Sequence, residues 1–151
     1  MTDGARALAV AFVAIAIAMI RLSRTALKAD PNSAASLVAE LRLAQFAALV
    51  LTLTAGIYIG SALVQESSAG SGLDVALAVG FLVLGSIAVT QDPSNALTLL
   101  AAAFIAHAGI DLLHGSQILP GDVLPAWYAT VSAIYDVAVA AVCYLPVLRR
   151  P

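Results

Sequence analysis

Charged residues are spaced so widely along this chain that they leave five uninterrupted apolar stretches. Each stretch approaches or exceeds the ~20 residues that an α-helix needs to cross about 30 Å of hydrocarbon. The pattern predicts five transmembrane helices, over residues 5–24, 40–64, 74–91, 95–114 and 124–148. The linkers between them are too short to hold a second folded unit, so we expect a single membrane domain over residues 1–151.

The composition favours a bilayer location and excludes several other classes of protein. Hydrophobic residues make up 62% of the chain and charged residues 11%, whereas soluble domains carry ~25% charged residues. Seven Lys and Arg residues and a net charge of −2 leave no basic face for nucleic acid. The single cysteine, Cys143, excludes an internal disulfide and a cysteine-rich metal site. The expected fold is therefore an all-α, polytopic helix bundle in a lipid bilayer.

The positive charges gather on one side of the expected topology. Six of the seven fall in the first loop or at the C-terminus: Arg21, Arg24, Lys28, Arg42, Arg149 and Arg150. Because positive loops stay in the cytoplasm, we expect the C-terminus inside and the N-terminus, with Arg6, outside. The Ala-rich, Lys-poor usage is bacterial in character, which predicts the cell inner membrane. Glu40 is expected to form a solvated ion pair with Arg42 at the cytoplasmic end.

The first apolar stretch also matches the apolar core of a secretory signal peptide in length. The residues that follow do not match, because Arg21-Leu22-Ser23-Arg24 stands where a cleavage site with small residues would be. A positive flank also holds that end in the cytoplasm. We therefore expect an uncleaved first helix.

Small residues recur in the second and third stretches. They are Gly56 and Gly60, four residues apart, and Gly80, Gly85 and Ser86. Small residues let helix backbones approach one another closely within a membrane. The pattern predicts close helix contacts at these positions.

Ionisable residues inside the expected helices are the main candidates for a functional site. A charge at the centre of a bilayer costs ~2.5–3.5 kcal/mol on insertion scales, so such groups usually face the bundle interior. Asp136 lies near the middle of the last stretch, and helical spacing places Tyr128, Ser132 and Cys143 on its stripe. That stripe is expected to face protein.

The fourth stretch carries a matching polar face. His107, Asp111 and His114 stand at positions i, i+4 and i+7, which share one side of a helix. A short Gly/Pro turn makes the last two helices antiparallel neighbours. We therefore expect His107 to meet Ser132 or Asp136.

Tyr58 and Asp74, near the outer ends of the second and third helices, are expected to complete the rim of this group. Three chemistries fit the set. Imidazoles and carboxylates suit a divalent metal such as zinc, or a non-haem iron, and the expected metal ligands are His107, Asp111, His114 and Asp136. The same groups could pass protons. Haem fits less well, because the chain has no third histidine.

Whether the chain is an enzyme stays open at this point. In an enzyme, a bound metal would activate water against a lipid-borne bond, with Asp136 as base and Ser132 as the other catalytic candidate. Alternatively, a His–Asp pair can neutralise itself on one helix, and an Asp in a span can serve only to bond a neighbouring helix. The protein would then be a non-catalytic membrane component that packs with a partner subunit or with copies of itself.

Three segments, His107-Ala-Gly-Ile-Asp111-Leu-Leu-His114, Pro125-Ala-Trp127-Tyr128 and Tyr135-Asp136, carry a family resemblance. They resemble the C-terminal half of small, uncharacterised bacterial multi-pass membrane proteins with H-x3-D-x2-H, a Pro/Trp/Tyr turn and a second Asp. The likeness covers about 30 residues. It implies a polytopic membrane protein whose last two helices carry the site, and it implies no activity.

Overall fold

The computed structural model describes residues 3–64, 70–120, 124 and 126–149. Within that part of the chain it has no strand and five helices: α1 (Asp3–Lys28), α2 (Ala34–Val64), α3 (Ser71–Ala88), α4 (Pro93–Gly115) and α5 (Ala126–Val147). All five are long and apolar enough to cross a membrane. The prediction of an all-α, multi-pass membrane protein is confirmed.

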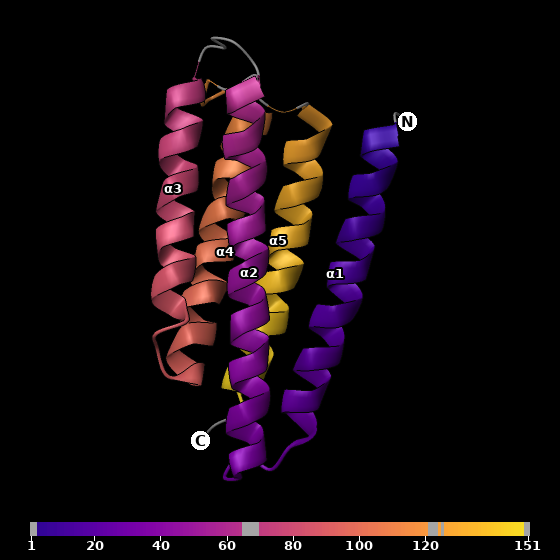
Figure 1. Ribbon diagram of the computed structural model, residues 1–151, viewed down its shortest axis with the longest axis vertical. Helices are drawn as coiled ribbons and strands as arrows, with labels where there is room; N and C mark the ends of the chain where they lie inside the picture. The colour runs from indigo at the N-terminus through magenta and orange to yellow at the C-terminus, as the bar shows by residue number, and fades with distance from the viewer. Residues whose placement is uncertain (1–2, 65–69, 121–123, 125, 150–151) are drawn as a thin grey trace.

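Successive helices run in opposite directions, so the bundle has two distinct ends (Figure 1). The α1–α2 and α3–α4 turns lie at one end together with the C-terminus, and we call this the C-terminal side. The N-terminus lies at the other end, where α2 and α4 finish and α3 and α5 begin, and we call it the N-terminal side. Arg21, Arg24 and Lys28 lie in the half of α1 nearer the C-terminal side. Arg150 and Pro125 lie outside the described residues.

Helix α2 is the central element of the bundle. It contacts all four other helices, and α4 and α5 pack along one another as antiparallel neighbours. The core between them contains fully buried apolar side chains: Leu43, Leu51, Leu97, Leu100, Phe104 and Cys143. Most of these residues lie midway along the bundle or toward its C-terminal side.

The turns on the C-terminal side follow from short polar side chains and proline. In the α1–α2 turn the Asn32 backbone N–H donates to Asp30 Oδ1 at 3.0 Å, and the Ser36 N–H donates to Ser33 Oγ at 3.2 Å. Ser33 thereby satisfies one of the free N–H groups at the start of α2. At the start of α4, Asp92 occupies the capping position without a side-chain bond, and Pro93 begins the helix.

The expected close contact of small residues is found at one glycine. A Cβ at Gly85 would lie 3.3 Å from Thr52 Oγ1 and 3.4 Å from the Ala48 carbonyl oxygen, so α3 and α2 need a glycine here. The same prediction is wrong for three other glycines, which have open space around the Cβ position: Gly56, Gly60 and Gly80. Those three lie on exposed faces of their helices.

Glu40 corrects another expectation, because its side chain is buried. The residue is 3% exposed, and Ser36 Oγ donates to Glu40 Oε1 at 3.3 Å, so it is not part of a solvated pair. Arg42 is exposed on another side of α2. The physical reason is helical spacing, since Glu40 shares its face with the buried Leu43 and Ala44.

Helix α1 is the least embedded element. In its most apolar window 11% of the residues are buried inside the protein, compared with 50% in α4. Figure 1 shows α1 leaning away from the other helices toward its N-terminal end. Its attachment includes the bond from Ser23 Oγ to the Val142 carbonyl at 3.0 Å and a ring contact between Phe12 and Tyr135.

Candidate functional site

The polar stripe of α5 faces the interior, as its spacing predicts. Tyr128, Ser132, Asp136 and Cys143 are all buried, each with 2% or less of its surface exposed. Helix α5 therefore turns its carboxylate and this polar stripe toward its neighbours, while Trp127, Thr130 and Tyr144 are exposed. This orientation brings Asp136 against the polar face of α4.

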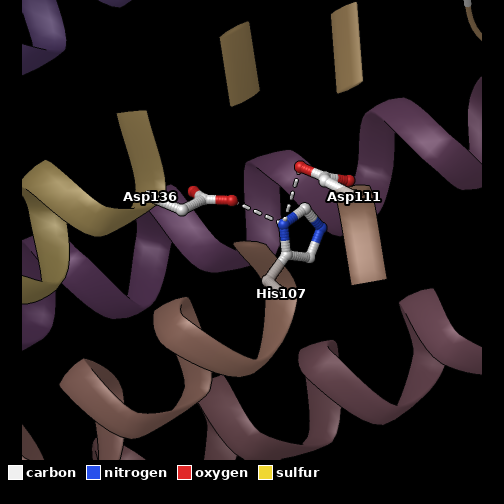
Figure 2. Close-up of side chains that lie close together, drawn as sticks. All are labelled: His107, Asp111 and Asp136. Atoms are coloured by element: carbon white, nitrogen blue, oxygen red, sulfur yellow. Dashed lines mark hydrogen bonds and ion pairs between the residues drawn. The ribbon is translucent and has the colours of Figure 1, made fainter. Parts of the chain in front are cut away.

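His107 lies between two carboxylates, as Figure 2 shows. Its Nδ1 atom is 2.6 Å from Asp136 Oδ2 on α5 and 3.4 Å from Asp111 Oδ2, one turn further along α4. One ligand atom from each residue lies within 4.8 Å of the other two. We call these three residues the His107 cluster. The expected meeting of His107 with Asp136 is confirmed.

All three members of the cluster are removed from solvent. His107 is 4% exposed, Asp111 0% and Asp136 1%. Asp111 also has a hydroxyl partner, since Tyr58 Oη donates to Asp111 Oδ1 at 2.6 Å. Ser132, also buried, lies one helical turn before Asp136 on α5. Tyr58 thus joins α2 to the cluster, so that three helices contribute to one polar centre.

Aromatic rings hold the imidazole in place. The ring of Phe81 on α3 meets the His107 ring edge to face, with centroids 4.8 Å apart, and the Tyr58 ring does the same at 5.7 Å. Such packing restricts rotation of the imidazole, which keeps Nδ1 directed at the carboxylates. Phe81 is a member of the site that the sequence did not single out.

The charge of the cluster requires compensation. With a neutral imidazole and two ionised carboxylates, His107, Asp111 and Asp136 would carry two negative charges in a dry interior. Burying an unpaired charge costs several kcal/mol, so such groups bind protons or cations instead. The cluster is therefore neutral only when it holds one divalent cation, or two protons in addition to the one on the neutral imidazole.

His114 belongs to a separate pair. Its Nε2 atom is 2.9 Å from Asp74 Oδ1 on α3, although neither atom makes a hydrogen bond of acceptable angle. His114 shares a face with His107 but lies seven residues away, which is about 10 Å along the helix axis. That separation keeps it out of the His107 cluster. We call Asp74 and His114 the His114 pair.

A small cavity lies between the two groups. Its lining comes from both groups and from apolar residues of α3 and α4: Tyr58, Asp74, Leu77, Ala78, Phe81, His107, Ile110 and His114. The space open to the centre of a water-sized sphere is about 10 Å³. This is close to the smallest volume that holds one water molecule.

Several buried polar atoms in this region have no hydrogen-bond partner among the described residues. They are Asp111 Oδ2, Asp74 Oδ1, both ring nitrogens of His114, and the hydroxyls of Tyr128 and Tyr135. Buried polar atoms are almost always satisfied in folded proteins, by protein groups or by water. These atoms lie in the half of the bundle toward the N-terminal side.

Comparison with protein-family models, curated proteins and solved structures gives no match to this chain. The functional argument therefore rests on the residues and their geometry. The catalytic roles expected for Asp136 and Ser132, and the metal-ligand role expected for His114, stay predictions.

Proposed function

We propose that this multi-pass membrane protein is a proton-binding protein whose His107 cluster binds the two protons that neutralise it, one of them held between His107 and Asp136. The distance of 2.6 Å between Nδ1 and Oδ2 carries the proposal. Two atoms that each present a lone pair repel at this separation, whereas a charge-assisted hydrogen bond has this length. A histidine paired with a carboxylate inside a membrane is also the usual element of a proton relay.

We further propose that the protein lies in a bacterial inner membrane with its N-terminal side outside. Support comes from the arginines and Lys28 near the C-terminal side, because positively charged segments are retained in the cytoplasm. His107 lies eight residues before the end of α4 at Gly115, which is about 12 Å along the helix. The cluster would then belong to the outer half of the membrane.

Histidine NMR tests the proton directly. The chain contains only two histidines, so protein labelled with ¹⁵N-histidine gives two sets of imidazole signals, which His114→Gln assigns. We expect a proton on His107 Nδ1 with the far-downfield shift of a short hydrogen bond. Asp136→Asn should remove that shift, because an amide is a weaker acceptor than a carboxylate. An unprotonated His107 Nδ1 in the wild-type protein would refute the proposal.

A divalent metal such as zinc is the second candidate ligand, because three suitable ligand atoms converge. Bonds of about 2.0–2.2 Å to a tetrahedral ion separate neighbouring ligand atoms by about 3.3 Å. Asp111 Oδ2 already lies 3.4 Å from His107 Nδ1 and has no hydrogen bond. Asp136 Oδ2, at 2.6 Å, would have to withdraw by roughly 0.7 Å. The arrangement therefore favours the proton.

Metal analysis separates the two candidates. Protein purified in detergent is analysed for bound metals by mass spectrometry, with His107→Ala and Asp136→Asn as comparison variants. If the wild-type protein contains stoichiometric zinc and both variants lose it, the ligand of the cluster is the metal and not the proton. If neither ligand is found and Asp136→Asn assembles normally, the cluster serves only to pack the helices.

A further inference from the structure

The cavity lies between the His107 cluster, deeper in the bundle, and the His114 pair, nearer the N-terminal side. Asp74 is the fourth residue of α3 and His114 the last but one of α4, so both lie within about one turn of the N-terminal side. His107 lies about two turns deeper on α4. Both histidines and Asp74 line the cavity.

The polar atoms around this cavity lack good hydrogen bonds. Asp74 is 3% exposed, and its Oδ1 atom contacts His114 Nε2 at 2.9 Å, but neither atom makes a hydrogen bond, and His114 Nδ1 has no partner among the described residues. A buried water needs two to four polar partners and about 10–15 Å³. Asp74, His114 and His107 supply the partners, and the cavity supplies about 10 Å³.

Toward the C-terminal side, the bundle buries few polar groups. Beyond the cluster, toward the C-terminal side, the buried residues of α4 and α5 are apolar, among them Leu100, Val139 and Cys143. On α2 the hydroxyl of Thr54 is bonded to its own helix at the Val50 carbonyl. The next buried carboxyl group is Glu40, 18 residues before Tyr58 and about 27 Å away along the axis.

We propose that the cavity binds one water molecule and that this water, with the His114 pair, forms a one-sided passage for protons between the N-terminal side and His107. The inference rests on the proton-binding function proposed above and adds the route. The passage ends at the cluster, so the protein takes up and releases protons on one side and does not conduct them across the membrane.

A proton follows this route by exchanging hydrogen bonds. A proton that arrives at the His114 pair is passed to the water, and the water donates one of its own protons to the His107 ring. Each step breaks one O–H or N–H bond and forms another, and no other reactant is needed. The apolar lining from Leu77, Ala78 and Ile110 excludes further water, which confines the exchange to this path.

Filling the cavity tests the passage. Ala78→Val adds two methyl groups to the cavity lining, and Ala76→Val adds the same two groups to an exposed position on the same helix. The rate at which the His107 ring protons exchange with water is measured by NMR saturation transfer. We expect Ala78→Val to slow the exchange at least about tenfold, equivalent to about 1.4 kcal/mol in the barrier. Ala76→Val should change it less than about twofold.

Two further measurements keep this test decisive. Cross-relaxation between the His107 ring and a bound water in the wild-type protein shows the water without any substitution. Asp74→Asn, which preserves side-chain volume, should slow the exchange even if Ala78→Val does not fold. Unchanged exchange in Asp74→Asn, or the absence of the water signal, would overturn the passage. Failure of the proton proposal is distinct, because the His107 Nδ1 proton itself would then be missing in the wild-type protein.

Discussion

The two halves of this bundle are held together by different interactions. The half toward the C-terminal side packs apolar side chains such as Leu43, Leu97 and Leu100. The hydrogen bonds of its buried polar groups include one within α2 from Ser36 to Glu40 and one between α1 and α5 from Ser23 to the Val142 carbonyl. The half toward the N-terminal side buries His107 and three aspartates, Asp74, Asp111 and Asp136. Lipid-embedded helices do not need such groups in order to associate. The comparison assigns stability mainly to one half and chemistry to the other.

The largest expected effect on folding comes from apolar packing at the middle of α4. Phe104 is fully buried, and Phe104→Ala should lower the free energy of unfolding by about 2–4 kcal/mol through lost packing. The lower part of the usual range applies because the surrounding lipid is itself apolar. Thermal unfolding in detergent measures the change, and Ile105→Ala at the exposed neighbouring position is the control. Equal losses in both variants would contradict the division into two halves.

An intermediate effect of opposite sign is expected in the polar half. The quadruple variant Tyr58→Phe/His107→Leu/Asp111→Val/Asp136→Val replaces the whole buried charged group with apolar side chains. We expect its free energy of unfolding to equal that of the wild-type protein or to exceed it by about 1–2 kcal/mol. Asp136→Val alone should lose stability, since it removes the contact at 2.6 Å and leaves buried His107 Nδ1 with only the longer contact to Asp111 at 3.4 Å. A folded quadruple variant would show that the fold does not need the cluster. If the variant does not fold, the cluster is required for the structure of the polar half.

The smallest expected effect on the free energy of unfolding concerns one contact between α2 and α3. Gly85→Ala should cost about 1 kcal/mol, because the new methyl group would lie 3.3 Å from Thr52 Oγ1 and 3.4 Å from a backbone oxygen. Gly80→Ala meets open space and should be neutral or slightly stabilising through helix propensity. Unfolding of the two variants side by side gives the difference. A loss at Gly80 as large as at Gly85 would show that the contact with α2 does not account for the cost.

The sequence predicted those features that depend on one helix or on two helices joined by a short turn. Charge spacing predicted the five apolar helices, and helical periodicity predicted the buried stripe of Tyr128, Ser132 and Asp136. The contact of His107 with Asp136 followed because consecutive antiparallel helices are neighbours. Each of these inferences needs only local spacing.

Features that depend on the order of helices in space were not predictable in the same way. Asp74 was expected at the rim of the polar group, but its pairing with His114 was not, because only the packing of α3 against α4 brings the two together. Glu40 looks like a solvated end residue in the sequence, yet its face is covered by other helices. Phe81 joined the site for the same reason, since an aromatic residue in an apolar stretch carries no signal of its partner.

The weak attachment of α1 has a consequence for how the protein is made. A helix that turns most of its surface to lipid depends on its own hydropathy for its position, not on helices synthesised after it. The ribosome can therefore release α1 into the bilayer as a finished element before α2 emerges. The remaining four helices must then associate in the bilayer. Their polar groups are stable in lipid only after α5, the last helix to be translated, has packed against α4 and brought Asp136 to His107.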